Sequence, residues 1–215
     1  MIYSTLFSKD TYEDPKTSSI IGAILLLPDS LIFKIFNKAC SPNIMPLNNG
    51  LISDFEFWPH WYDDTYNVNF VEPDVIIHCE YRDIIIEAKY GEKSGLYREQ
   101  WQKEIIAYRN FYDYKKGLTL IAIGGNETYN AEKVEGVDIM KCSWTSLLMA
   151  VSSIRSQFES LSCNDEHINQ ILRILKFIEK SFEVHGVYNP IPLDVKPLTE
   201  FPSYSSNHSL LHFAL

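Results

Sequence analysis

Two short apolar runs joined by a polar segment constrain the fold of this chain more than any other feature. Residues 71–79 and residues 83–90 are both rich in Val and Ile, and these residue types favour β-strands. The joining segment, residues 80–83, is polar and short enough for a tight turn. The sequence therefore predicts a β-hairpin close to the middle of the chain.

The charged residues of this hairpin fall at its open end. A turn centred on residues 81 and 82 pairs Ile76 with Glu87 and Asp74 with Lys89. Because side chains alternate between the two faces of a strand, Asp74, Glu87 and Lys89 then share one face. Directly opposed side chains in such a hairpin lie about 5 Å apart. We therefore expect these three charged groups to form one cluster.

The chemistry of this cluster favours a hard metal ion. Asp74 and Glu87 supply carboxylate oxygens, and the backbone carbonyl of Ala88 stays near the cluster although its side chain points to the other face. Mg²⁺ prefers oxygen ligands and keeps several waters, and a neighbouring ammonium can orient an attacking water or neutralise a phosphate oxygen. The alternative is that these charges at strand ends are simply solvated.

The same residues carry a resemblance to a known family. Pro73-Asp74, followed by Glu87-Ala88-Lys89 at the end of the next apolar strand, resembles the motif of the PD-(D/E)XK nuclease superfamily. Gln100, on the helix expected next, is similar to a Gln that many members carry there. The resemblance covers roughly residues 50 to 125. It implies a restriction-endonuclease-like fold, in which a mixed central sheet is flanked by helices.

The resemblance also implies roles for individual residues. Asp74, Glu87 and the carbonyl of Ala88 would bind Mg²⁺, with Mn²⁺ as a substitute. Lys89 would assist the attacking water, and Gln100 would steady the site. The implied activity is metal-dependent hydrolysis of nucleic acid, endo- or exonucleolytic, in defence or repair, with DNA as the expected polymer.

Other polar residues near the motif have less definite roles. Many members of the superfamily carry a further acidic residue upstream, and Glu56 is the candidate here, with Asp54 as the alternative. A solvent-facing Glu on an edge strand is the competing interpretation. On the helix, Gln102 is the alternative to Gln100, and Glu104, one turn after Gln100, is expected to hold it. His78 is expected to be a core histidine with satisfied hydrogen bonds.

The remaining sequence predicts an α/β domain over residues 1–186 and a Pro-containing extended tail over residues 187–215. Ser143 is expected to cap the first of two C-terminal helices, and Gly186 to end the second. This helical pair would flank the sheet or form a dimer surface. The further expected elements are an extended arm (residues 1–16), helices (17–40, interrupted at Pro28, and 96–114) and strands (one within 50–61 that ends at Pro59, then 118–124 and 137–141).

Composition limits the function classes. The chain has 215 residues and a net charge of −9, which argues against a broad nucleic-acid-coating surface. A basic partner subunit could hold the polymer instead. The expected assembly is a homodimer or a complex with a partner subunit. The alternative function is a non-catalytic interaction subunit with a restriction-like fold, and a weaker one is hydrolysis of another phosphate ester.

The cysteines and the hydropathy pattern indicate the cellular compartment. The four cysteines are scattered without metal-binding spacing, so free thiols in a reducing cytoplasm are expected. The apolar run at residues 20–27 stops at Pro28 and is too short to span a bilayer. We therefore expect a cytoplasmic protein without a membrane partner.

Overall fold

The computed structural model describes residues 13–43, 45, 49–63, 68–91, 98–112, 116–126, 128–161 and 165–190. Most of the predicted N-terminal arm and the predicted tail from residue 191 onwards lie outside these ranges. Within them, every helix is too short or too polar to cross a bilayer.

The centre of the molecule is a mixed six-stranded sheet with the strand order β1-β4-β5-β6-β8-β7. Strands β5, β6 and β8 run parallel, and the remaining neighbours pair antiparallel. A separate hairpin is formed by β2 and β3. This confirms the predicted α/β class and the mixed central sheet. The strands are β1 (Ile52–Phe57), β2 (Trp61–Asp63), β3 (Val68–Val71), β4 (Val75–Cys79), β5 (Arg82–Ala88), β6 (Gly117–Ile123), β7 (Glu132–Val134) and β8 (Val137–Cys142).

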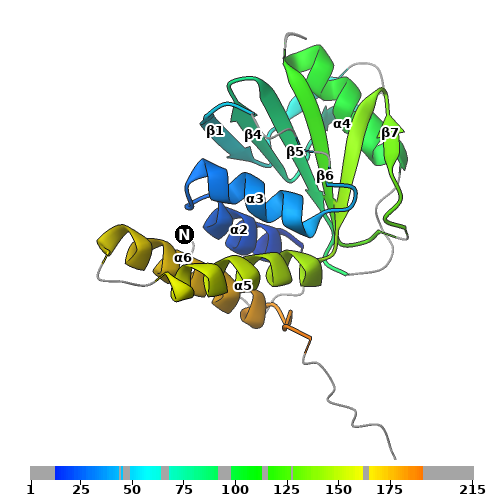
Figure 1. The fold of residues 1–215 in the computed structure, drawn as a ribbon. Helices are drawn as coiled ribbons and strands as arrows, with labels where there is room; N and C mark the ends of the chain where they lie inside the picture. The colour runs from blue at the N-terminus through cyan, green and yellow to red at the C-terminus, as the bar shows by residue number, and fades with distance from the viewer. Residues whose placement is uncertain are drawn as a thin grey trace, which may run out of the picture.

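Helices cover both faces of the sheet (Figure 1). On one face lie four helices, in which α3 packs on α5, α2 packs on α6, and α5 and α6 form the predicted C-terminal pair. On the other face lies α4, together with the β2–β3 hairpin. The five helices of the described residues are α2 (Glu13–Ile24), α3 (Asp29–Ala39), α4 (Arg98–Phe111), α5 (Trp144–Ser160) and α6 (Glu166–Val184).

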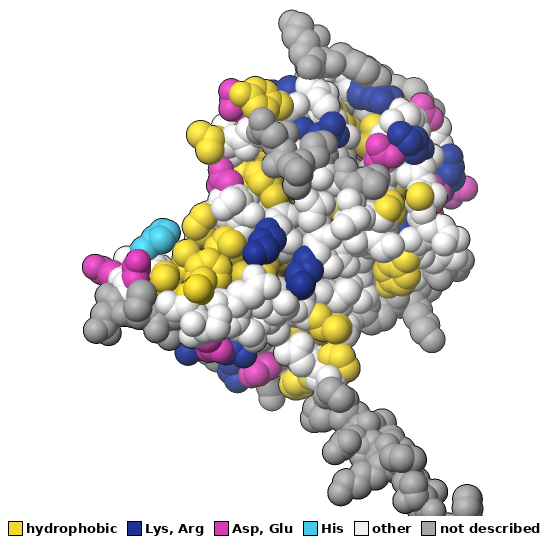
Figure 2. Space-filling model, in the orientation of Figure 1, with side chains coloured by type: hydrophobic (Ala, Val, Ile, Leu, Met, Phe, Trp, Pro, Cys, Tyr) yellow, Lys and Arg dark blue, Asp and Glu magenta, His cyan; other side chains and the backbone are white. Residues whose placement is uncertain are grey.

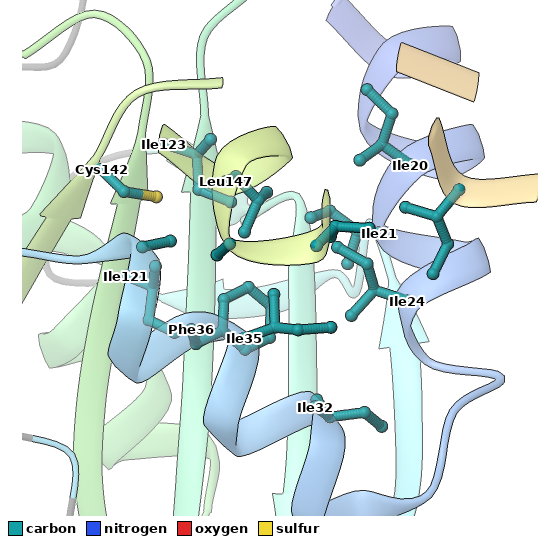
Figure 3. Packing of buried hydrophobic residues seen from close by; sticks show 14 of the residues in the cluster. Ile20, Ile21, Ile24, Ile32, Ile35, Phe36, Ile121, Ile123, Cys142 and Leu147 are labelled. Atoms are coloured by element: carbon teal, nitrogen blue, oxygen red, sulfur yellow. The ribbon is translucent and has the colours of Figure 1, made fainter. Parts of the chain in front are cut away.

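The alternation of apolar residues along the strands divides the core into two clusters. Odd-numbered residues of β6, such as Ile121 and Ile123, face Phe36 of α3 and Leu147 of α5 in the larger cluster (Figure 3). Neighbouring positions of β6, including Ala122, face α4 and its Trp and Tyr side chains in the smaller cluster. The face that carries α4 is the one on which the candidate site lies.

The β4–β5 hairpin forms, but its register differs from the prediction by two residues. His78 pairs with Asp83 and Ile76 pairs with Ile85, so the predicted pairing of Ile76 with Glu87 is wrong. The physical reason lies at the turn, where the Asp83 carboxylate accepts hydrogen bonds from the backbone N–H of Cys79 and from His78. A shift of two residues leaves every side chain on its predicted face.

Several element boundaries also differ from the prediction. Helix α2 begins at Glu13, inside the segment predicted to be extended. Strands β2, β3 and β7 were not predicted, because strands of three or four residues display little alternation. Ser143 caps α5 and Gly186 ends α6, as predicted, while Asp165 supplies the cap of α6.

The described cysteines and the visible surface agree with the composition. Cys40, Cys79 and Cys142 are buried free thiols, and Cys163 lies outside the described residues. On the face drawn in Figure 2, described acidic and basic side chains are interspersed, and hydrophobic side chains gather over the helical layer.

Candidate active site

Asp74 and Glu87 lie side by side where the β4–β5 hairpin opens. Val75 pairs with Ile86, so Asp74, the residue before β4, comes next to Glu87. Only 7% of Asp74 and 2% of Glu87 is exposed. Asp74 Oδ2 accepts a hydrogen bond of 2.7 Å from the backbone N–H of Ala88. Two carboxylates are therefore held together in a nearly buried position.

Lys89 completes the charged cluster predicted from the sequence. Its Nζ lies 2.7 Å from Glu87 Oε1. The side chain of Lys89 is 21% exposed, whereas that of Glu87 is 3% exposed. The ammonium therefore joins the buried carboxylate to the protein surface, where a substrate would approach.

Helix α4 brings Gln100 to the same carboxylate. Gln100 Nε2 donates a hydrogen bond to Glu87 Oε1, which thus accepts from both Gln100 and Lys89. The alternative candidate, Gln102, donates to Glu135 instead. The structure therefore brings Asp74, Glu87, Lys89 and Gln100 together.

Glu104 is a further acidic residue of this site. It lies one turn after Gln100 on α4, is 1% exposed and hydrogen-bonds both Gln100 and Glu87. Burial, followed by repulsion from the Glu87 carboxylate, raises the pKa of Glu104 well above its usual value. Glu104 Oε2 is buried without a hydrogen-bond partner. A protonated Glu104 carboxyl group that donates to Glu87 accounts for this arrangement.

The sequence contains a signal for Glu104 beyond its spacing from Gln100. The apolar stripe of α4 includes Trp101, Ile105 and Tyr108, all buried against the sheet. Glu104 lies three residues after Trp101 and four before Tyr108, and therefore on the same side of the helix. An acidic residue within a buried stripe needs a polar partner, and Glu87 and Gln100 are its partners here.

The donor set of the site fits a hard divalent cation. The N–H of Ala88 points to the Asp74 side of β5, and in an extended strand the carbonyl of a residue points to the same side as its N–H. The Ala88 carbonyl is thus directed towards the two carboxylates. No group of three or more His, Cys, Asp or Glu side chains in the described ranges is arranged to hold a metal. Two carboxylates, one carbonyl and several waters form the set that Mg²⁺ accepts.

Glu56 lies in a different set of contacts. It sits on β1 opposite Ile76, with its side chain 50% exposed and Oε1 3.8 Å from His78 Nε2. This contact is directed towards the turn of the hairpin. Asp54, the alternative, lies opposite His78 and is exposed. The metal-binding role of Glu56 stays a prediction.

His78 belongs to a polar cluster beside the turn, as expected for a satisfied core histidine. Its Nδ1 lies 3.0 Å from Asp83 Oδ2, which also accepts from the Tyr108 hydroxyl at 2.9 Å. The hydrogen bond to Asp83 raises the pKa of His78. Burial alone would raise the pKa of Asp83, but the hydrogen bonds from His78 and Tyr108 outweigh burial and lower it. This cluster ties the hairpin to α4.

Comparisons with known proteins give a distant structural likeness. The chain matches no family model and no curated protein. Among solved structures it is similar to the small subunit of the heterodimeric restriction endonuclease R.BspD6I, with 12% identity over 60% of this chain and 80% of that one. The TM-score is 0.29, so the likeness identifies no family. The function is therefore argued from the residues of the site.

Proposed function

We propose that this chain is a metal-dependent nuclease of the PD-(D/E)XK type that hydrolyses phosphodiester bonds, with DNA as the expected polymer. The observation that carries the proposal is the convergence of Asp74, Glu87 and Lys89 at the open end of one hairpin. Burying two carboxylates and an ammonium together is unfavourable unless each has a partner. Such an arrangement is typical of a site that performs chemistry.

Each residue of the site has a role that follows from its contacts. Asp74, Glu87 and the Ala88 carbonyl would hold Mg²⁺, or Mn²⁺ in its place. When bound, the ion supplies polarisation of the phosphate and a more acidic water. Lys89, next to Glu87 and partly exposed, orients the attacking water or neutralises the phosphate charge. Gln100, on α4, holds the Glu87 carboxylate in place through its hydrogen bond.

The net charge bears on how the polymer is held. A chain with a net charge of −9 gains no long-range attraction to nucleic acid. We therefore propose that a basic partner subunit contributes to binding the polymer.

A cleavage assay with matched variants tests the proposal. Supercoiled plasmid, linear duplex, single-stranded DNA, RNA and a small phosphodiester are incubated with Mg²⁺, Mn²⁺ or EDTA. We expect cleavage of a polymer that depends on the metal and that Asp74→Asn and Lys89→Ala each reduce on the order of 10²-fold or more. Asp138→Asn is the control, because Asp138, on β8, forms an exposed ion pair with Lys133 of β7.

The other outcomes are also decisive. Metal-dependent cleavage that both site variants leave unchanged would assign the activity to a contaminant. Activity on the small phosphodiester alone would indicate a different phosphate ester as substrate. Absence of both cleavage and calorimetric Mg²⁺ binding would overturn the catalytic interpretation and leave a non-catalytic interaction subunit.

A further inference from the structure

The backbone that follows β5 is held by side chains from the opposite face of the sheet. Lys89 ends the sheet pairing, since its N–H donates to the Ile123 carbonyl at 2.8 Å. Its own carbonyl accepts a hydrogen bond of 2.6 Å from Nε1 of Trp144, in α5. The next carbonyl, that of Tyr90, accepts one of 2.9 Å from Nζ of Lys16, in α2. Two consecutive carbonyls are thus bound by two different helices.

The third carbonyl of this segment is held as well. The Gly91 carbonyl accepts a hydrogen bond of 2.8 Å from the N–H of Gly125. Gly124 allows this close approach: its φ is +67°, and a Cβ there would lie 2.6 Å from the Lys89 and Gly91 carbonyl oxygens and 3.0 Å from Trp144 Nε1. We call the hydrogen-bond donors Lys16, Gly125 and Trp144 the carbonyl clamp.

Lys16 places an ammonium group in a nearly buried position. Only 4% of it is exposed, although its helix packs into the larger apolar cluster. Its Nζ lies 4.6 Å from the ring centroid of Trp144 and 5.0 Å from that of Tyr90. A buried ammonium costs free energy unless it is paired, and a Met would fill this position with less cost. The gain that offsets burial is the hydrogen bond to the Tyr90 carbonyl and the contact with two aromatic rings.

We propose that Lys16 and Trp144 are positioning residues that fix the backbone of Lys89, and through it the Lys89 ammonium beside Glu87. This inference rests on the proposed nuclease function. The sheet holds Lys89 only through its N–H, because β5 ends at Ala88. Without the clamp, the Lys89 carbonyl would lose its hydrogen bond from Trp144 Nε1, and the ammonium would be held less firmly beside the carboxylates.

The test is a double-mutant cycle on single-turnover cleavage. Lys16→Met and Trp144→Phe remove a donor and keep an apolar side chain. Misplacing a catalytic group by about 1 Å can cost on the order of 10²-fold in rate, so we expect each variant to lower kcat 10- to 100-fold with little change in calorimetric Mg²⁺ affinity. In the Lys89→Ala background the same substitutions should have almost no further effect, since the group that they position is absent.

The controls separate this inference from the function on which it rests. Trp61→Phe shortens an equally buried indole on the opposite face of the sheet, and it should leave kcat within a few-fold of the wild type. Equal losses from Lys16→Met with and without Lys89 would overturn the inference and leave Lys16 a structural residue, while the nuclease assignment stands. A wild-type chain that neither cleaves any substrate nor binds Mg²⁺ would overturn both. If Lys16→Met does not fold, Trp144→Phe decides by the same cycle.

Discussion

Asp74 Oδ2 accepts a hydrogen bond from the backbone N–H of Ala88, fourteen residues later in the chain. The first carboxylate of the candidate site is therefore also the acceptor that satisfies the last N–H of β5. Because strand β4 begins only at Val75, no strand backbone lies opposite this N–H. Asp74 therefore has a structural role, as the acceptor for the Ala88 N–H, and a proposed role in metal binding. Substitutions at Asp74 can separate these two roles.

Asp74→Asn and Asp74→Ala should differ in stability but not in activity. Asn keeps an acceptor oxygen for the Ala88 N–H, whereas Ala leaves that buried N–H without a partner at a cost of roughly 1–3 kcal/mol. Neither variant retains the carboxylate, so both should lose metal-dependent cleavage. Urea unfolding in EDTA measures the difference, and equal stabilities of the two variants would show that the hydrogen bond contributes little.

Glu104→Gln should stabilise the metal-free protein increasingly as the pH rises. The folded-state pKa of Glu104 is raised by burial and by Glu87. The stability that Glu104 contributes is therefore fully present below the unfolded pKa of about 4.3. It is lost as the pH rises through the folded-state pKa, because the buried carboxyl group then becomes charged. Gln remains neutral throughout. Urea unfolding in EDTA at pH 5, 7 and 9 checks this, with Glu183→Gln as an exposed control on α6; a constant difference across these pH values would contradict it.

Asp83→Asn should destabilise the protein most between about pH 4 and pH 6.5. The lowered pKa of Asp83 gives stability that is present above its unfolded pKa near 4 and lost at lower pH. The raised pKa of His78 gives stability that is present below 6.5 and lost as the pH rises through the folded value. The expected loss in this window is roughly 1.5–3 kcal/mol. A loss of stability that stays constant from pH 3 to pH 9 would show that it does not come from the His78–Asp83 pair.

Gly124→Ala should be far more damaging than Gly136→Ala. Both glycines have positive φ, +67° and +75°, so both substitutions carry a backbone cost of about 1–2 kcal/mol. A Cβ at Gly136 meets nothing within 4 Å, whereas one at Gly124 would displace the Lys89 and Gly91 carbonyls. Unfolding free energy and cleavage rate should both fall further for Gly124→Ala. Similar values for the two variants would indicate that the backbone after β5 relaxes easily.

The strand faces could be predicted from the sequence, but the strand register could not. Alternation along the two apolar runs assigns Asp74 and Glu87 to one face, and the structure places them there. A shift of two residues preserves that alternation, so the pattern contains no information against it. The register depends on the Asp83 side chain, which binds the Cys79 N–H across the turn.

The residues that support the site were harder to find than those of the motif. Glu104 has an acidic side chain on a helix, a combination that most often faces solvent, and its burial depends on how α4 packs against the sheet. Lys16 and Trp144 contact the segment after β5 across sequence separations of 74 and 55 residues. Local sequence patterns predict which face of a strand or helix a residue occupies. Long-range contacts such as these depend on how the helical layers pack against the sheet.

Under the proposed nuclease function, the carbonyl clamp would make the timing of activity depend on the order of folding. The motif residues lie within one continuous segment, but Lys89 is held by a helix near the start of the described chain and by another that follows the last strand of the sheet. During synthesis, the motif leaves the ribosome well before α5 does. A growing chain would then contain every motif residue and yet lack a fixed Lys89 ammonium, so the proposed hydrolysis would begin only once the helical layer that contains α2 and α5 has assembled.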